Sequence, residues 1–142
     1  MTPEGRIKAA ILRYLERLGF YAWNNTTGAV RVRPGKFIRF GKVGSSDIIG
    51  VLPDDRFLAV ETKTPKGRLS PEQAAFLEKI RCSGGVAVVA RSFRELDAAL
   101  RHEGYADDGP LFSEAIQGKN ENRDRPVISQ RNGVEIGVFI GE

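Results

Sequence analysis

Two carboxylates and one lysine lie in one short stretch of the chain and could together hydrolyse a phosphodiester bond. Asp47 begins an apolar run, and Glu61 and Lys63 end the next run, with the turn residues 53–55 between them. Carboxylate oxygens are the ligands that Mg²⁺ and Mn²⁺ prefer, and a bound cation lowers the pKa of its water. A lysine beside the cation can orient that water or stabilise the transition state. The alternative is a surface salt bridge between Glu61 and Lys63, the commoner outcome for an isolated Glu-x-Lys on a strand.

The two carboxylates meet only if the turn between the runs has a suitable length. Side chains alternate along a strand, and opposed residues of an antiparallel pair share a face. A three-residue loop over 53–55 places Asp47 opposite Glu61. A two- or four-residue loop places Ile48 opposite Glu61 and separates the carboxylates. One shared site therefore requires an odd loop, or a bulge that restores the phase.

Capping and turn signals predict the helices and strands around this site. A helix is expected from Thr2 to Gly19, because Thr2 can cap it, Pro3 suits its first position and apolar residues follow at helical spacing. Residues 70–73 (SPEQ) are a capping box that opens a second helix, and residues 92–95 open a third. Strands are expected over residues 20–23, 30–33, 37–40, 47–52, 57–62 and 86–90. This order predicts an α/β or α+β fold with a mixed central sheet.

Composition excludes several other kinds of site. The 142 residues suit one domain, or one domain with a tail. No apolar run approaches the roughly 20 residues of a membrane span, and the N-terminus lacks the order of a signal peptide. The single cysteine, Cys82, excludes an internal disulfide and a cysteine-built zinc site, and the single histidine, His102, excludes a histidine-built one. We expect a cytoplasmic protein with no membrane partner.

The basic charge is concentrated in the first part of the chain. The net charge is +4, yet residues 1–50 carry nine Lys or Arg against three Asp or Glu. A basic region around a carboxylate site suits a polyanionic substrate such as nucleic acid. A solvated basic face without a ligand explains the charge equally well.

These motifs together resemble the PD-(D/E)XK nuclease superfamily, and most closely the VRR-NUC family, a nuclease domain also found at the C-terminal end of Fanconi-associated nuclease. That family shows a G-x-x-D strand, a short turn, an E-x-K strand, and K-G-x-L-S-x-x-Q leading into a helix. The matching residues are 44–47 (GSSD), 61–63 (ETK) and 66–73 (KGRLSPEQ), with Ser46 where the superfamily often has proline. The resemblance covers roughly residues 3–103. It implies a restriction-endonuclease-like core in the order α-β-β-β-α-β.

The resemblance also implies roles for individual residues. Asp47, Glu61, Lys63 and Gln73 would be catalytic. Asp47 and Glu61 would be metal ligands, together with an acidic residue on the first helix, matched by Glu4. The strand register itself suggests the Thr62 backbone carbonyl as a third oxygen ligand. Two of these residues have simpler explanations. Glu4 also suits the positive end of a helix dipole, and Gln73 also suits the third position of the capping box.

Basic side chains on both sides of the carboxylates are expected to contact phosphates. The nearest in sequence are Arg39, Lys42, Lys66 and Arg68, and Arg31, Arg33 and Lys36 come before them. Trp23 and Phe40 are expected in the core rather than as platforms for stacked bases.

We therefore expect a metal-dependent DNA endonuclease that uses Mg²⁺ or Mn²⁺ on branched DNA such as a flap or four-way (Holliday) junction, and that works as a homodimer in a bacterial cell or phage-infected host. The alternatives are a catalytically silent nucleic-acid-binding module and a nuclease acting on linear duplex DNA. Residues 1–104 would form the nuclease domain. Residues 105–142 would form an extension with a polar linker at 117–126 and a hairpin within 127–140.

Overall fold

A computed structural model describes residues 1–105, 127–131 and 134–138, with side chains over residues 1–105. Its helices and strands agree closely with the expected segments. They are α1 (Pro3–Arg17), β1 (Tyr21–Asn24), β2 (Gly28–Arg33), β3 (Lys36–Phe40), β4 (Ile48–Val51), β5 (Phe57–Thr62), α2 (Pro71–Cys82), β6 (Val86–Ala90), α3 (Phe93–His102), β7 (Val127–Arg131) and β8 (Val134–Val138).

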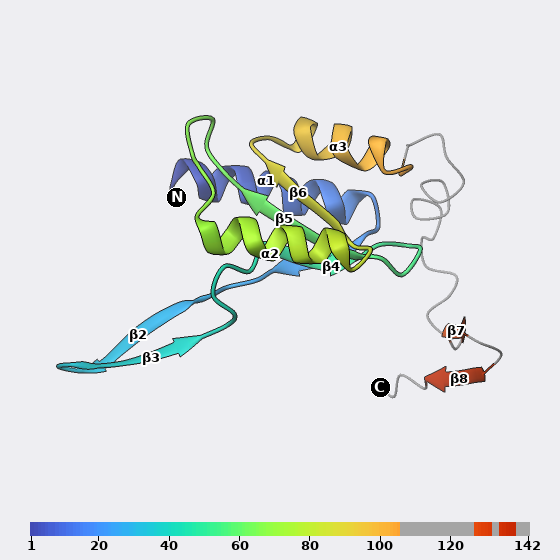
Figure 1. The fold of residues 1–142 in the computed structure, drawn as a ribbon. Helices are drawn as coiled ribbons and strands as arrows, with labels where there is room; N and C mark the ends of the chain where they lie inside the picture. Colours follow the sequence, from blue (N-terminus) through green and yellow to red (C-terminus); the bar gives the residue numbers. More distant parts are fainter. Residues whose placement is uncertain (106–126, 132–133, 139–142) are drawn as a thin grey trace.

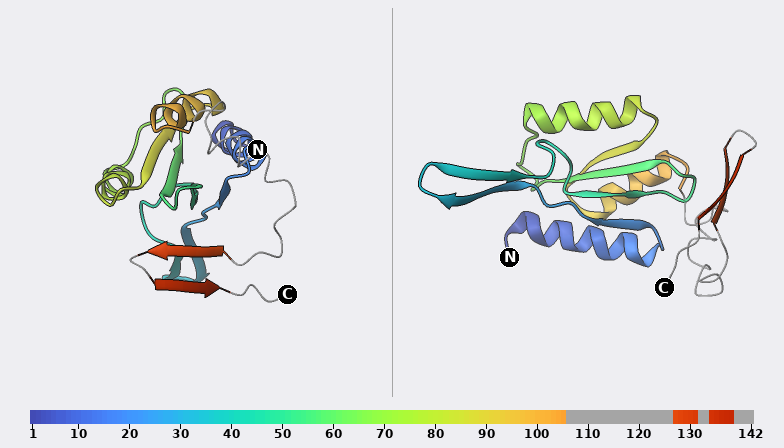
Figure 2. Two further views of the ribbon diagram at one scale, coloured as in Figure 1. Left: turned by 90° about the vertical axis from the view of Figure 1, so that its right-hand side faces the viewer. Right: turned by 90° about the horizontal axis from the view of Figure 1, so that it is seen from below.

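A four-stranded mixed sheet lies at the centre of the fold. Its order is β1-β4-β5-β6, with antiparallel pairing from β1 to β4 and from β4 to β5, and parallel pairing between β5 and β6. The helix α2 connects the parallel pair, as a crossover between parallel strands requires. Figures 1 and 2 show α1 and α3 on one face of the sheet and α2 on the other. The expected mixed α/β architecture is confirmed.

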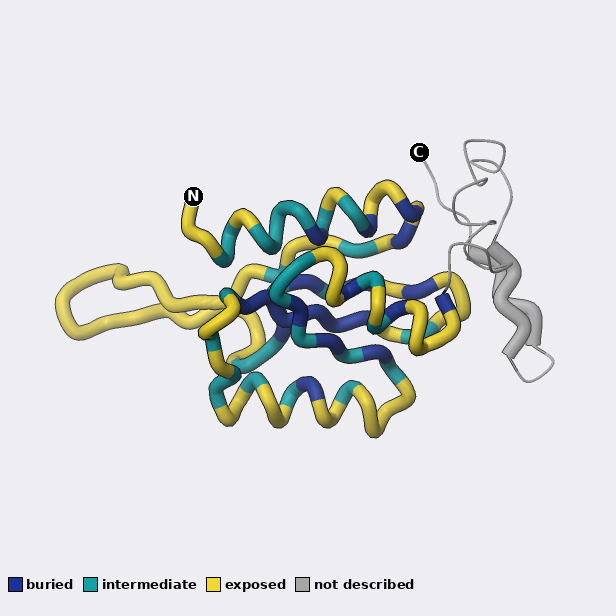
Figure 3. The backbone as a smooth tube through the Cα atoms, turned by 90° about the horizontal axis from the view of Figure 1, so that it is seen from above, coloured by how far each residue is buried: buried dark blue, intermediate teal, exposed yellow. Residues whose placement is uncertain are grey.

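The main core fills the space between the sheet and the α1–α3 layer. Burial is concentrated in the central strands and in the helix faces that cover them (Figure 3). Leu58 and Val60 of β5 are fully buried there, whereas Glu61 and Lys63 are buried at the end of the same strand. The residues that pack together in this core are Ile11, Leu15, Leu18, Phe20, Ile48, Leu52, Leu58, Val60, Val86, Val88, Ala90, Leu96, Leu100 and Tyr105.

The helix starts follow the expected caps. Thr2 caps α1 through its side-chain oxygen, and residues 70–73 form both hydrogen bonds of a capping box at α2. Ser92 caps α3, but the Glu95 carboxylate accepts a bond from the N–H of Arg91 rather than from that of Ser92. Local side-chain chemistry thus sets where each helix begins.

The strands β2 and β3 form a separate two-stranded sheet, called the arm below (residues 28–40). Every residue of both strands is exposed, so the alternation of Val and Arg at 30–33, which is typical of a half-buried strand, gives a wrong indication of burial here. The alternation there separates two faces that both meet solvent. The expectation that Trp23 and Phe40 lie in the core is also wrong, since they are 43% and 42% exposed. Trp23 lies on an edge strand and Phe40 on the arm.

β7 and β8 pair antiparallel, as the expected hairpin requires. The polar stretch 117–126 and the turn at 132–133 lie outside the described residues. Among the helices that the structure describes, none is long and apolar enough to cross a membrane.

Candidate active site

The β4–β5 hairpin sets the two carboxylates opposite each other. Ile48 pairs with Val60, and the ladder continues to the turn, where Leu52 N–H donates to the Arg56 carbonyl at 2.8 Å. The connection is therefore the three-residue loop 53–55. Asp55 closes it at φ 70°, a left-handed conformation that aspartate tolerates and that three-residue hairpins use. Continued past Ile48, this pairing places Asp47 opposite Glu61, as predicted.

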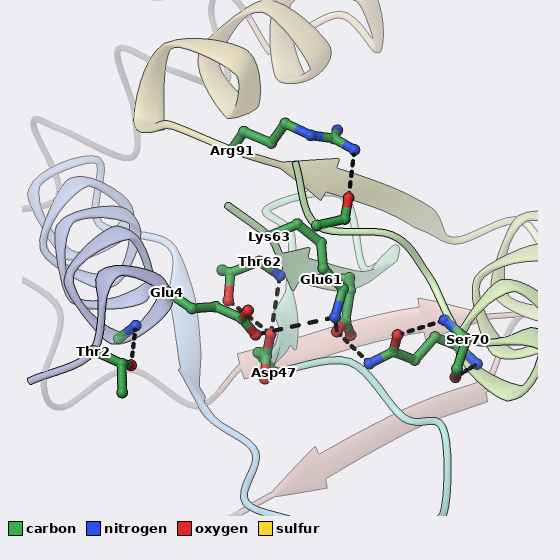
Figure 4. Close-up of polar contacts among 11 residues, drawn as sticks. Thr2, Glu4, Asp47, Glu61, Thr62, Lys63, Ser70 and Arg91 are labelled. Carbon is green, nitrogen blue, oxygen red and sulfur yellow. Dashed lines mark hydrogen bonds and ion pairs between the residues drawn. The ribbon is translucent and has the colours of Figure 1, made fainter. Parts of the chain in front are cut away.

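Asp47 secures the end of β5 through one carboxylate oxygen. Its Oδ2 accepts hydrogen bonds from the Thr62 N–H at 3.0 Å and from the Thr62 hydroxyl at 2.7 Å. Its Oδ1 makes no hydrogen bond to any residue of the described chain, and Figure 4 shows the Asp47 side chain beside Thr62 and Glu4. The N–H and C=O of one strand residue point to the same side. The Thr62 carbonyl therefore points toward Asp47, as a third oxygen ligand must.

Glu61 is the most deeply buried charged side chain of the site, with 1% of its surface exposed. Its Oε1 accepts hydrogen bonds from the Gln73 amide at 2.6 Å and ion-pairs with the Lys63 ammonium at 3.2 Å. Its Oε2 is buried and has no hydrogen-bond partner. Burial and the nearby Asp47 charge raise the pKa of Glu61 to about 7, against the opposing effect of Lys63.

Gln73 joins the start of α2 to this carboxylate. Its Oε1 accepts from the Ser70 N–H at 2.9 Å, while its Nε2 donates to Glu61. Both explanations of Gln73 are therefore compatible in one conformation. One end of the amide caps the helix, and the other end holds Glu61 in place.

Glu4 approaches from the first turn of α1. Its Oε1 lies 4.0 Å from the Lys63 ammonium, and 43% of its side chain is exposed. The Glu4 charge is one of the influences that raise the pKa of Glu61. Figure 4 shows Glu4, Asp47, Glu61 and Lys63 directing their polar ends toward one region beside Thr62.

The sequence profile of the VRR-NUC domain matches residues 4–94 of the chain. The chain belongs to the VRR-NUC domain family. The domain is of a nuclease type, and the match includes all the residues of the candidate site.

Two solved structures have the same fold as this VRR-NUC domain. One, described as a VRR-NUC domain, is 24% identical with a TM-score of 0.52, and the alignment covers 72% of this chain and 98% of that one. The other, described as a VRR-NUC domain protein, is 18% identical with a TM-score of 0.50, covering 72% and 88%. No curated protein matches the chain.

The VRR-NUC site contains carboxylate and carbonyl oxygens, the donor types that Mg²⁺ and Mn²⁺ prefer. Within residues 1–105 no group of three or more His, Cys, Asp or Glu side chains is placed to hold a metal ion. The donors that remain are the unpartnered Oε2 of Glu61, Oδ1 of Asp47 and the Thr62 carbonyl. A buried carboxylate oxygen without a partner is costly unless it binds something, which favours a ligand at this point. Glu4 could join from the rim.

A hollow of about 430 Å³ opens beside these donors. It lies between the first turns of α1 and the ends of the strands, and Glu4, Lys8, Asp47, Thr62 and Thr64 are among its lining residues. Lys8 is a basic residue that the sequence analysis did not select. The signal was present, because Lys8 lies four residues after Glu4 and therefore on the same face of the helix.

The expected phosphate-binding residues lie on two separate segments and do not form one cluster. Lys66 and Arg68 are exposed in the loop between β5 and α2, whereas Arg39 and Lys42 are exposed on and after the arm. Arg91, at the end of β6, donates to the Gly67 carbonyl at 3.2 Å and so fixes the loop that carries Lys66 and Arg68. The sequence analysis missed this role, because nothing local links residues 67 and 91.

Asn25 was also missed. Its side-chain amide donates to the Ser45 hydroxyl at 2.8 Å and to the Ser46 carbonyl at 2.9 Å, and its N–H donates to the Asp47 carbonyl at 2.7 Å. Asn25 thereby positions the segment that presents Asp47. No local pattern in the sequence indicates these partners.

Proposed function

We propose that this VRR-NUC domain is a divalent-metal-dependent DNA endonuclease that uses Mg²⁺ or Mn²⁺. The observation that best supports the proposal is the Glu61 carboxylate. Lys63 and Gln73 hold its Oε1, and its Oε2 is left buried without a partner beside Asp47. A salt bridge that served only stability would have no use for a second acid, a buried amide donor and an unpaired oxygen in the same place.

Each residue of the site has a role in phosphodiester hydrolysis. Asp47 Oδ1, Glu61 Oε2 and the Thr62 carbonyl would hold the cation, with Glu4 at the rim. A cation there would supply an acidified water and neutralise charge on the phosphate. Lys63 ion-pairs with Glu61 at 3.2 Å and would orient the attacking water or stabilise charge on the phosphate oxygens. Gln73 donates to Oε1 of Glu61 and so restricts the orientation of the carboxylate.

We further propose that the substrate is branched DNA, such as a flap or four-way junction, and that two copies act together. The described part of each chain contains one site of this kind, whereas resolution of a four-way junction needs paired cuts on symmetric strands. A two-fold dimer has that symmetry and is the commonest homo-oligomer. The hairpin β7–β8 offers strand edges that could pair with a second chain. We also propose that the protein acts in the cytoplasm of a bacterial cell or phage-infected host.

A DNA panel tests the activity. Purified full-length protein is incubated with linear duplex, splayed, flap and four-way substrates, with Mg²⁺, with Mn²⁺ or with EDTA. We expect cleavage of branched substrates that needs the metal and is lost in Asp47→Asn. Binding without cleavage under every condition would favour the silent binding module. Equal cleavage of linear duplex would favour the duplex nuclease.

Light scattering tests the dimer. We expect the full-length protein at micromolar concentration to have twice the monomer mass, and a chain ending at residue 126, before β7, to be monomeric. A monomeric full-length protein that still resolves four-way junctions would refute the symmetry argument.

A further inference from the structure

The arm (residues 28–40) projects from the main sheet and contains none of the carboxylate site. It extends away from the sheet and the helices in Figures 1 and 2, and every residue of β2 and β3 is exposed. A two-stranded ribbon without further support is only marginally stable in water. The rest of the described chain does not cover it, so the arm presents two free faces to a partner.

The charge of the arm region has one sign. Residues 18–46 contain no Asp or Glu and five basic residues, which are Arg31, Arg33, Lys36, Arg39 and Lys42. None of the five forms an ion pair with a carboxylate within residues 1–105. Five unneutralised cations on and next to one projecting ribbon attract a polyanion.

The pairing of β2 with β3 places basic and apolar residues on different faces. Ala29 pairs with Arg39, and Arg31 pairs with Phe37, so both arginines and one aromatic ring share one face. Arg31 and Arg39 lie on different strands, and Arg39 is opposite Ala29, two residues before Arg31. This face therefore carries guanidinium groups on both strands.

The opposite face is apolar near the body of the protein and basic at the tip. Val30 pairs with Ile38, and the Phe40 ring lies over Gly28, where an added Cβ would approach to 2.9 Å. The register then shifts by one residue and brings Arg33 opposite Lys36 at the turn. The apolar pairs hold the two strands together, while cations occupy the far end.

The root of the arm is tied to the catalytic strand. Asn25, just before β2, binds Ser45, Ser46 and Asp47 through three hydrogen bonds. Only six residues separate Phe40, the last residue of β3, from Asp47. Whatever the arm holds is therefore fixed in position relative to the carboxylates.

We propose that the arm lies along a groove of the duplex that flanks the cut, with Arg31 and Arg39 on its phosphates and the Arg33–Lys36 tip at the far end. The inference rests on the proposed action on DNA. A major groove about 12 Å wide admits a two-stranded ribbon. Six strand residues at about 3.3 Å each reach roughly 20 Å, the length of about six base pairs.

A second copy of the chain is a weaker fit to this surface. The large apolar side chains that the arm exposes are Val30, Val32, Phe37, Ile38 and Phe40. Five such side chains on two faces supply only part of the roughly 800 Å² per partner that a stable interface buries. The unpaired cations would also remain unneutralised in such a dimer.

The test compares two variants that each lose two positive charges. Arg31→Ala with Arg39→Ala removes cations from the arm, and Arg13→Ala with Arg17→Ala removes exposed cations from α1. Both are made in full-length protein carrying Asp47→Asn, so that binding is measured without cleavage. Fluorescence anisotropy across a salt series gives affinity, and hydroxyl-radical footprinting shows which base pairs are covered.

We expect the arm variant to bind about tenfold or more weakly, with a log–log salt dependence lower by about two, because two phosphate contacts are lost. Its footprint should lose about six base pairs on one side of the branch, while the α1 variant keeps it. Equal losses in both variants, or an unchanged footprint in the arm variant, would overturn the proposal. The proposal would also be overturned if light scattering showed a dimer that Ile38→Thr dissociates, while the variant Arg31→Ala with Arg39→Ala bound DNA normally. If the wild-type protein never cut DNA but its DNA binding still depended on the arm, the proposed nuclease activity would be refuted and the role of the arm would stand.

Discussion

Glu61→Gln should make the metal-free protein more stable at high pH. The substitution keeps the size of the side chain and an acceptor for Gln73 and Lys63, and removes only the charge. In the folded wild type the pKa of Glu61 is raised from 4.5 to about 7, mainly by burial and by the Asp47 charge. Below pH 4.5 the carboxyl is protonated in both the folded and the unfolded chain, so the wild type and the variant should be similarly stable.

The expected magnitude follows from the size of that shift. Between pH 4.5 and about 7 the unfolded chain has lost a proton that the folded chain still holds, so the free energy of unfolding falls as pH rises. A shift of about 2.5 pKa units at about 1.4 kcal/mol per unit corresponds to about 3 kcal/mol. Above pH 8 the variant should therefore be more stable than the wild type by up to about 3 kcal/mol.

Denaturant unfolding at a series of pH values from 4.5 to 8.5, in EDTA, measures this difference. Every other titrating group, including His102, is common to both proteins, so the difference isolates Glu61. Glu16→Gln, which removes an exposed carboxylate on α1, is the control for the loss of one negative charge. A difference between wild type and Glu61→Gln that stays constant across the pH range would refute the inferred cost of burying this charge. Adding Mn²⁺ at pH 8 should stabilise the wild type, by about 2.7 kcal/mol at a hundred times the Kd, and leave the variant unchanged.

Three further substitutions separate the chemistry of the site from its folding. Asp47→Asn should lower the cleavage rate by several orders of magnitude with near-normal stability. Asp47→Ala should in addition lower the free energy of unfolding by about 1–3 kcal/mol in denaturant titrations, because the buried Thr62 N–H and hydroxyl lose their acceptor. Rapid cleavage by either folded variant would contradict the assignment of Asp47 as a metal ligand. Lys63→Met should cut DNA at least about a hundredfold more slowly in single-turnover assays. It should bind Mn²⁺ normally at pH 8.5 but weakly at pH 6.5 by calorimetry, because without Lys63 the pKa of Glu61 rises further; weak binding at both pH values would instead make the lysine a structural partner. Gln73→Glu should keep the helix cap and lose the donor to Glu61, so that helicity measured by circular dichroism persists while cleavage falls; a drop in both would mean that the cap, not the Glu61 contact, is its main role.

From the sequence, the hairpin register could be reduced to a choice between loop lengths, because few local features determine it. The residues 53–55 (PDD) favour a tight turn, and the alternation of the flanking runs then decides which residues oppose each other. Capping residues fixed the starts of α1 and α2 in the same local way. What the pattern could not reveal is which side chains meet across elements, since no periodicity connects Asn25 with Ser46, or Arg91 with Gly67.

The arm shows a different limit of sequence reasoning. Alternation of apolar and basic residues at 30–33 predicts a strand correctly, and a strand is what forms. It does not say whether the apolar face meets the core or solvent, because both give the same period. Burial depends on where the ribbon lies relative to the sheet, and that is set by its root at Asn25 and by Gly41, where an added Cβ would approach Thr27 to 2.7 Å. The exposure of Phe40 follows from this placement rather than from its own chemistry.

The polar contacts that organise this site also hold its secondary structure together. Asp47 caps the end of β5 through Thr62, Gln73 caps α2 while it holds Glu61, and Asn25 joins the arm to the strand that presents Asp47. Truncation to alanine at these positions therefore removes a hydrogen bond of the fold together with a group of the site. Substitutions that keep the hydrogen-bonding atom and change only charge or polarity avoid that ambiguity. For this reason the amide and acid exchanges at 47, 61 and 73 test the chemistry more directly than any truncation.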